Sequence, residues 1–335
     1  MLNRLLRMKL QMIKEENIMY PLKLSPVFKE IVWGGNRLKD DFGFETDLKN
    51  IAEAWMLTAR KDGDNIILNG DFSGKLFTEY LKENPEVVGS KAKSDAEFPL
   101  LIKFIDAKTD LSIQVHPDDE YAQAHEDCSG KTEAWFILDC TEGAELVYGF
   151  NTDIDRETLR LAIEDGTFEK YIKKVKVKKG DIYFIPSGTL HAICGGILLA
   201  EVQQNCAITY RVYDYKRLVD GVLRPLHIDK ALDVVHTAPP SDIKTASAPV
   251  TDGDAVFTDL CECEFFKMTT LELNGAHTLN VGDESFLSIL VYDGSGEIAY
   301  GDNILSVNKG DSIFVPANLG SFTVKGNFKA LLSTM

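Results

Sequence analysis

Apolar and polar residues alternate along much of this chain, which is the period-2 pattern of strands with one buried face. Such runs fall within residues 53–58, 101–107, 112–116, 175–212 and 255–335. Apolar residues recur at helical spacing only in shorter stretches, namely residues 70–89, 151–172 and 229–236. The pattern therefore predicts a mainly β fold in which short helices are inserted between strands.

The clearest helical block, residues 151–172, lies between two β-rich regions. Asp155 stands where the side chain of an N-cap residue accepts a backbone hydrogen bond, and Gly166 stands where a helix commonly ends. A helical insertion between strands of the first β region is the simplest account of this block, and residues 70–89 and 229–236 add neighbouring helices.

One alternating strand carries polar residues that can bind a metal ion. In the run Ser-Ile-Gln-Val-His, Gln114 and His116 point to one face, and Pro117 ends the strand because proline cannot donate to a ladder. A second strand begins near Lys131 and places Lys131 and Glu133 on a common face. Two adjacent strands would thus offer an amide oxygen, an imidazole and a carboxylate to one place.

A candidate fourth ligand follows a later turn and strand. Residues 179–190 read as a Lys-Gly-Asp turn, a strand and a Pro-Ser-Gly turn, and they lead directly to His191. Gln114, His116, Glu133 and His191 form a mixed nitrogen and oxygen set that suits a borderline ion such as Zn²⁺, although Co²⁺ and Mn²⁺ also accept such ligands. A single strand histidine is more often a satisfied polar residue, so the prediction depends on the four residues together.

The chain contains an internal repeat. Residues 308–317 (NKGDSIFVPA) match residues 178–187 (KKGDIYFIPS), and this offset aligns Ser321 with His191. We therefore predict two β modules, of which only the first keeps the metal ligands. Pro239-Pro240 suggests the boundary, which gives a catalytic domain at residues 19–238 and a C-terminal β domain at residues 239–335.

Composition limits the possible partners. The chain has 335 residues and a formal net charge of −16, which argues against nucleic acid or an anionic membrane surface as partner. No apolar run is long enough for a transmembrane helix, and the scattered cysteines suit a reduced cytoplasmic protein. Residues 1–18 are amphipathic without a cleavage site, so we expect an extension that carries no chemistry.

The motifs together resemble a known family. A Gln-x-His strand followed by Gly-Asp and a later histidine resembles the small jelly-roll barrel of a cupin. This resemblance implies a mainly β fold of two cupin-like jelly-roll modules, with the helical insertion in the first. From about Tyr20 onward the chain resembles type I mannose-6-phosphate isomerase in its short bacterial form. The resemblance rests on Trp33-Gly34-Gly35, residues 112–122 (SIQVHPDDEYA), 130–135 (GKTEAW), 186–193 (PSGTLHAI) and 209–214 (TYRVYD). Thr58-Ala59-Arg60 departs from the Ser-Ala-His type of ending expected there.

The resemblance implies an aldose–ketose isomerase that interconverts mannose 6-phosphate and fructose 6-phosphate through an enediol(ate). It implies one Zn²⁺ per chain on the four candidate ligands named above. Arg211 would be the catalytic arginine, and Lys131 and Glu201 would also lie in the active site. The identity of the general base stays open between Glu201 and other groups, and a salt bridge that orients Arg211 is an equally good interpretation of Glu201.

The anionic substrate needs positive charge near the site. Arg211 and Lys131 are the candidate substrate-binding residues, and Arg217, next to Lys216, extends the basic cluster. Alternative functions are another metallo-cupin, such as an iron oxygenase or a different sugar-phosphate isomerase, and a sugar-binding protein without turnover. Gln114 argues against the oxygenase, which more often uses histidines with one carboxylate.

Overall fold

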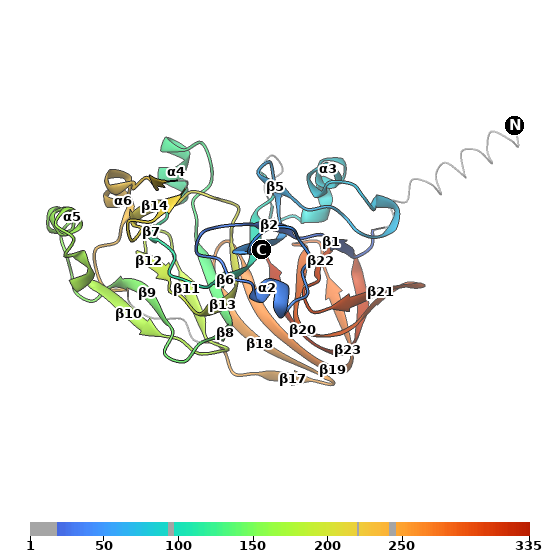
Figure 1. The fold of residues 1–335 in the computed structure, drawn as a ribbon. Helices are drawn as coiled ribbons and strands as arrows, with labels where there is room; N and C mark the ends of the chain where they lie inside the picture. The colour runs from blue at the N-terminus through green and yellow to red at the C-terminus, as the bar shows by residue number, and fades with distance from the viewer. Residues whose placement is uncertain (1–18, 93–96, 220, 241–245) are drawn as a thin grey trace, which may run out of the picture.

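The computed structural model describes residues 19–92, 97–219, 221–240 and 246–335. Three large β-sheets lie side by side in it (Figure 1). The predicted extension at residues 1–18 lies outside the described residues. The fold is mainly β with short helices, so the predicted fold class is confirmed.

Two sheets form the first module. The six-stranded sheet has the order β11 (Ile182–Ile185), β8 (Glu133–Cys140), β13 (Ile197–Gln204), β6 (Leu100–Ala107), β3 (Glu53–Leu57) and β2 (Val27–Lys29). The five-stranded sheet has the order β10 (Ile172–Lys176), β9 (Glu145–Phe150), β12 (His191–Ile193), β7 (Ile113–Val115) and β14 (Tyr210–Tyr213). Apolar side chains from both sheets, such as Leu199 and Ile193, pack between them.

The helices are short and lie outside the sheets. The α-helices are α2 (Arg37–Asp40), α3 (Phe77–Glu83), α4 (Asp119–His125), α5 (Arg156–Glu164) and α6 (Ile228–Val234). Single 3₁₀ turns are η1 (Gly70–Phe72), η2 (Pro85–Val88) and η3 (Phe168–Lys170). None of the helices among the described residues is long and apolar enough to cross a membrane.

The predicted helical block at residues 151–172 contains α5 and η3. The Asp155 side chain accepts a hydrogen bond from the Thr158 backbone N–H at 2.8 Å, so the predicted N-cap is confirmed. Helices α5 and α6 pack Leu159 and Leu232 against the outer face of the five-stranded sheet. This face is therefore closed to solvent, and the polar face of the same sheet points inward.

The third sheet curls around its own core to form the second module. Its order is β1 (Leu22–Leu24), β22 (Ser312–Val315), β20 (Leu287–Tyr300), β23 (Gly320–Thr334), β19 (Lys267–Val281), β18 (Ala255–Glu262) and β17 (Val250–Asp252), with β21 (Asn303–Asn308) paired to β20. Gly275, Gly326 and Gly296 are register partners across three strands, and a Cβ on Gly326 would lie 2.5 Å from the Gly296 Cα. Glycine lets these long strands bend together.

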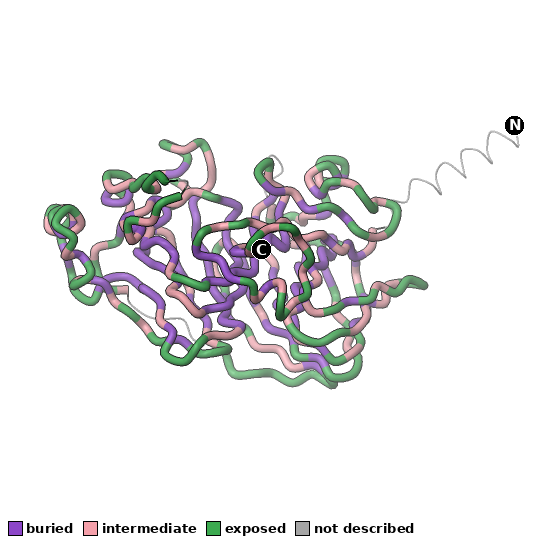
Figure 2. The backbone as a smooth tube through the Cα atoms, in the orientation of Figure 1, coloured by how far each residue is buried: buried purple, intermediate pink, exposed green. Residues whose placement is uncertain are grey.

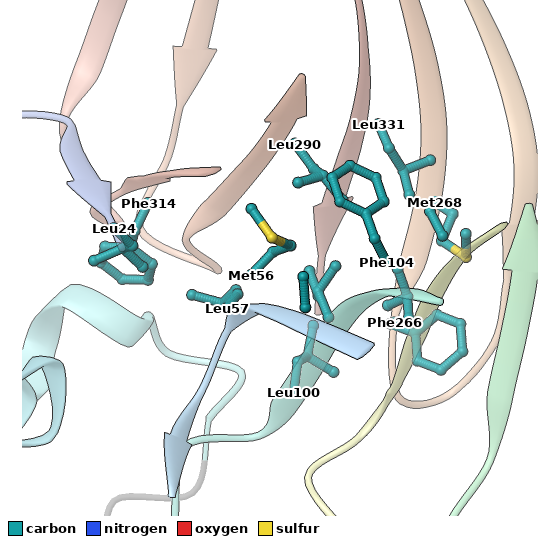
Figure 3. Close-up of a cluster of buried hydrophobic side chains, with 14 of the residues drawn as sticks. Leu24, Met56, Leu57, Leu100, Phe104, Phe266, Met268, Leu290, Phe314 and Leu331 are labelled. Carbon is teal, nitrogen blue, oxygen red and sulfur yellow. The ribbon is translucent and has the colours of Figure 1, made fainter. Parts of the chain in front are cut away.

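The two modules share one hydrophobic core. The outer face of the six-stranded sheet, with Phe104 and Leu100, packs against Met268, Leu290 and Phe314 of the third sheet (Figure 3). Strand β1, from the start of the described chain, pairs with β22 of the second module. Figure 2 shows buried backbone concentrated in the stacked sheets and exposed backbone in the loops and helices around them.

Two small hairpins complete the described structure. One joins β4 (Ala59–Arg60) to β5 (Gly63–Asp64), and the other joins β15 (Leu218–Val219) to β16 (Val222–Leu223). The second hairpin follows β14 and exposes its apolar side chains.

Candidate active site

Three residues that the sequence selected as metal ligands meet between the two sheets of the first module. One ligand atom from each of His116, Glu133 and His191 lies within 4.8 Å of the others. His116 follows β7, His191 opens β12 of the same sheet, and Glu133 opens β8 of the facing sheet. Each residue is only 1% exposed. The fold thus collects two imidazoles and a carboxylate from distant parts of the chain into one buried cluster.

Backbone carbonyl groups orient both imidazoles. His116 Nδ1 lies 2.7 Å from the Ile208 carbonyl oxygen, and His191 Nδ1 lies 2.8 Å from the Thr189 carbonyl oxygen. Each Nδ1 therefore carries the proton and donates, which leaves a lone pair on each Nε2 that can accept from Lys131 or Gln114 or bind a metal ion. Burial lowers the pKa of His191 to about 4 and lowers the pKa of His116 well below its usual value. Both side chains are neutral at pH 7, as metal binding requires.

Glu133 lacks well-directed hydrogen bonds in this cluster. Glu133 Oε1 lies 3.3 Å from His191 Nε2, and Glu133 Oε2 lies 2.7 Å from Lys131 Nζ. Neither carboxylate oxygen accepts a hydrogen bond of good geometry from the described residues. Burial, together with the nearby Glu201 carboxylate, raises the pKa of Glu133 to about 7. A buried carboxylate beside two imidazole lone pairs fits a divalent cation.

Gln114 completes the group from the strand next to His191. Its Cα is the register partner of His191, and its Nε2 lies 3.4 Å from His191 Nε2. Its Oε1 accepts a hydrogen bond from the Ser112 hydroxyl at 3.1 Å. A metal ion would be bound by the amide oxygen of Gln114. A flip of the side-chain amide would exchange Oε1 and Nε2 and so bring Oε1 to the cluster.

A chain of buried charges continues from the cluster across the six-stranded sheet. Lys131 Nζ lies 3.9 Å from Glu201 Oε1, Lys103 Nζ lies 2.9 Å from the same oxygen, and Lys103 Nζ lies 3.5 Å from Glu53 Oε2. Trp135 Nε1 donates to Glu201 Oε2 at 2.8 Å. Burial opposes the charge of Glu201, but Lys103 and Lys131 outweigh it and lower the pKa of Glu201 to about 2.

The charge chain forms one wall of a cavity of about 450 Å³. Gln114, Lys131 and Glu201 line this cavity, whereas the more deeply buried His116, Glu133 and His191 do not. The cluster therefore lies behind a wall that Gln114 and Lys131 form, since each of these two side chains contacts it.

Two arginines line the same cavity from the end of the five-stranded sheet. Arg211 is on β14, opposite Gln114 in register, and Arg224 follows the β15–β16 hairpin. The Nε of Arg211 is buried and has no hydrogen-bond partner among the described residues. Burial lowers the pKa of Arg211, and the nearby Arg224 charge lowers it further. Both observations mark a place where an anion would be stabilised.

Arg217 lies elsewhere, although the sequence had suggested it for substrate binding. Its Nη2 donates to Asp214 Oδ1 at 2.6 Å, and its guanidinium stacks over Tyr215 at 5.1 Å from the ring centroid. It lines a separate surface hollow beside Asp110, not the main cavity. The structure brings Arg224 to the cavity in the place where Arg217 was expected.

Two family models match parts of this chain. The family model for the phosphomannose isomerase type I catalytic domain matches residues 21–135, and the model for the mannose-6-phosphate isomerase cupin domain matches residues 257–335. The mannose-6-phosphate isomerase of Bacillus subtilis is 39% identical over 93% of this chain and 98% of its own length. The chain belongs to the type I phosphomannose isomerase family.

Further relatives support this membership. The mannose-6-phosphate isomerase of Streptococcus mutans is 35% identical over 93% of this chain and 98% of its own length. A crystal structure of the mannose 6-phosphate isomerase from Bacillus subtilis superposes with a TM-score of 0.88, covering 94% of this chain and 99% of that one. The similarity to type I phosphomannose isomerases thus extends over nearly the whole chain.

Arg60 is the residue at which this chain departs from the motif expected for the family, and it lies next to the rim of the cavity. Arg60 pairs with Asp62 at 2.8 Å, and its Nη1 donates to the carbonyl and side-chain oxygens of Asn205 at 3.2 Å. Asn205 immediately precedes Cys206, which lines the cavity. Arg60 therefore contacts the segment that follows β13.

The sequence analysis missed several charged residues of the cavity, among them Lys103, Glu53 and Arg224. Lys103 and Glu53 lie in strands that were correctly predicted, and the alternation that places Lys103 with Ile105 was visible. A lysine within an otherwise apolar strand is the signal that could have identified it. Arg224 gave no such signal, because it lies beyond a hairpin whose direction the sequence does not specify.

Proposed function

We propose that this chain is an isomerase that interconverts mannose 6-phosphate and fructose 6-phosphate. The observation that carries the proposal is the buried His116, Glu133 and His191 cluster directly behind a cavity with two arginines, in a member of the type I phosphomannose isomerase family. Relatives that match over nearly their whole length bear the name mannose-6-phosphate isomerase.

The proposed metal site consists of His116, Glu133, His191 and the Gln114 amide oxygen. Two neutral imidazoles, one amide and one carboxylate suit Zn²⁺, and the carbonyl partners of both Nδ1 atoms hold the rings in the required tautomer. When bound there, a zinc ion would supply a Lewis acid that polarises substrate oxygens without redox chemistry. One ion per chain follows from the single cluster of this kind among the described residues.

The reaction moves a proton between C2 and C1 of the open-chain sugar, and negative charge develops on the neighbouring oxygens. Lys131 lines the cavity beside the cluster, so its ammonium can stabilise that charge as it develops. Glu201 is held as a carboxylate by Lys103, and a carboxylate with a pKa of about 2 is a weak base at neutral pH. We therefore assign Glu201 to holding Lys103 and Lys131 in place.

The phosphate group needs cations that are not already neutralised. Arg211 has an unpartnered Nε, and Arg224 reaches Asp214 Oδ1 only at 3.5 Å, whereas Arg217 holds the same oxygen at 2.6 Å. Arg211 and Arg224 together leave net positive charge at the cavity of a chain with a net charge of −16. This supports an anionic substrate, bound bidentately by arginine.

A coupled assay tests the proposal. Fructose 6-phosphate formed from mannose 6-phosphate would be followed with the purified chain as prepared, after removal of metal with a chelator, and after addition of Zn²⁺. We expect turnover that the chelator abolishes and Zn²⁺ restores. No turnover with Zn²⁺ present would overturn the substrate assignment, and other aldose phosphates would then be tested in the same format.

A further inference from the structure

Positive and negative side chains are almost balanced around the cavity. Five lysine and arginine side chains and four carboxylates line it, so the lining residues carry an excess of one positive charge. The carboxylates are those of Glu30, Glu53, Asp62 and Glu201. A phosphate monoester carries a charge of about −1.5 to −2 at pH 7. Because the positive excess is so small, one additional charge beside the cavity changes how well such an anion binds.

Asp62 receives its counter-charge from a residue outside the lining. Glu53 and Glu201 share Lys103, which lines the cavity with them. Asp62 is instead paired with Arg60, which does not line the cavity. Arg60 Nε donates to Asp62 Oδ1 at 2.8 Å, and Arg60 Nη2 donates to Asp62 Oδ2 at 3.3 Å. This is the two-point arrangement in which a planar guanidinium binds a carboxylate.

The remaining nitrogen of the guanidinium fixes Arg60 in this position. Its Nη1 donates to the backbone carbonyl oxygen and to the side-chain oxygen of Asn205, each at 3.2 Å. Asn205 is itself buried, and its N–H donates to the Pro99 carbonyl oxygen at 2.9 Å. Lys29 Nζ donates to the backbone carbonyl oxygen of Asp62, so the backbone of Asp62 is also held. The pair is therefore fixed at the rim of the cavity from both sides.

The pair matters more for the charge of the cavity than for folding. Burial opposes the charge of Asp62, but the hydrogen bonds and the charge of Arg60 outweigh it and lower the pKa of Asp62 below its usual value. Asp62 is therefore ionised at neutral pH. Half of its side chain is exposed, and an ion pair so accessible to solvent adds little to folding stability. Without Arg60, however, the carboxylate would face an incoming anion without its ion-pair partner.

We propose that Arg60 is a positioning residue for the anionic substrate, because its ion pair with Asp62 keeps the rim of the cavity positive enough to bind a phosphorylated sugar. The proposal rests on the proposed function and names a residue that sets substrate affinity in this chain. The motif expected here for the family ends in histidine, which is mostly neutral at pH 7. The permanent positive charge comes from the arginine that departs from this motif.

The test measures mannose 6-phosphate binding and turnover with the full chain loaded with Zn²⁺. Arg60→Gln should raise the apparent Kd, measured by isothermal titration calorimetry, and the KM by about three- to tenfold. The effect on kcat should be much smaller, because Arg60 does not touch the reacting atoms. The increase in Kd should shrink in about 0.5 M NaCl, since salt screens charges at the rim.

Matched variants separate the charge of Arg60 from its contacts. Arg60→Lys keeps the charge and should retain most of the affinity. Adding Asp62→Asn to Arg60→Gln removes the uncompensated carboxylate and should restore the affinity. Lys61→Gln is the control, because it removes the same charge from an exposed neighbour that does not line the cavity. Its effect on Kd should be much smaller than that of Arg60→Gln, since solvent screens Lys61.

Three outcomes decide the proposal. An unchanged Kd in Arg60→Gln would overturn it. A raised Kd that Asp62→Asn does not restore would also overturn it, because the contact with Asn205 and not the charge would then be responsible. A chain that does not bind mannose 6-phosphate at all would contradict both this proposal and the proposed function. If the unaltered chain binds mannose 6-phosphate without turnover, the proposed function fails, but the dependence of Kd on Arg60 still tests this proposal.

Discussion

At the scale of single residues, the cavity wall is made of buried charges that depend on one another. Lys103 is 7% exposed and lies between Glu201 and Glu53, and Glu201 also accepts from the Trp135 indole. Burial lowers the pKa of an isolated lysine, yet the two carboxylates raise the pKa of Lys103 above its usual value. Removing one of these charged side chains leaves its partner buried and unpaired. The resulting loss of folding stability is larger than the net contribution of the ion pair itself.

Lys103→Met should therefore lower the free energy of unfolding by about 3–5 kcal/mol, as measured by urea denaturation. The double variant Lys103→Met with Glu201→Gln removes both charges and should recover much of that loss. Equal stability of the single variant and the unaltered chain would contradict the proposed dependence of these charges on each other.

The same pair predicts a dependence of stability on pH. The folded pKa of Glu201 is about 2, below the ordinary value of about 4.3 for glutamate. Its contribution to stability is therefore fully present above the ordinary value and is lost as the pH falls toward 2. Between these two pH values, the free energy of unfolding should fall more steeply with decreasing pH in the unaltered chain than in the double variant, as measured by denaturation curves. An equal pH dependence of the free energy of unfolding in both chains would show that another group causes the acid sensitivity.

His191→Ala should weaken Zn²⁺ binding by more than about 100-fold, because a direct ligand matters more than its outer partners. Far-UV circular dichroism should change little, since the cores on both sides consist of other residues. Ser321→Ala is the matched control: Ser321 aligns with His191 in the internal repeat, but it is exposed and donates to Asn280. Metal analysis after dialysis should distinguish the two variants, and full zinc retention in His191→Ala would refute the ligand assignment.

At the scale of elements, strand β14 places Arg211 at the edge of a sheet. On one side Arg211 is the register partner of Gln114 on β7. On the other side the Arg211 N–H donates to His227 Nδ1 at 3.2 Å, and the His227 N–H donates to the Arg211 carbonyl oxygen at 2.8 Å. His227 thus occupies the open edge of the strand where a further strand would otherwise pair.

His227→Ala should lower kcat/KM by about tenfold, equivalent to about 1.4 kcal/mol, because the Arg211 N–H loses its side-chain acceptor at the edge of the sheet. His227→Asn keeps a hydrogen-bond acceptor close to the position of Nδ1 and should restore most of the activity. Amide hydrogen exchange at Arg211 should be faster in His227→Ala alone. Unchanged exchange in that variant would show that β14 does not depend on His227.

At the scale of the whole molecule, the two modules are joined by a continuous core. Phe314 on β22 stacks against Phe286 and meets Phe77 edge to face, and this joins the second module to α3. Strand β1 adds backbone pairing across the same boundary. The division of the chain at residues 238 and 239 stays a prediction, but its two sides cannot separate without exposing this core.

Phe314→Ala should lower the free energy of unfolding by about 3–5 kcal/mol. Because the core is shared, both modules should still unfold in a single transition at the lower stability. Urea denaturation followed by tryptophan fluorescence tests this expectation, since all three tryptophans belong to the first module. The exposed Ile304 provides the control, and Ile304→Ala should leave the transition unchanged. If circular dichroism detects the loss of stability while the tryptophan transition keeps its midpoint, the two modules unfold independently.

The sequence alone determined which face of each strand each side chain occupies. Alternation is a local property of an extended backbone, so Gln114 and His116 could be assigned to one face and Ile113 to the other. The structure confirms this, because Gln114 lines the cavity, His116 lies in the buried cluster and Ile113 packs in the core under the helices. The same local logic located the strand of Glu201 and the N-cap Asp155.

Only the tertiary structure decided which of these faces meet. Glu201 pairs with Lys103 and not with Arg211, and the cavity is reached by Arg224 and not by Arg217. Each of these pairings depends on strand order, on register or on the direction of a loop. None of these is encoded in a local pattern, because they follow from how distant segments bury their surfaces together.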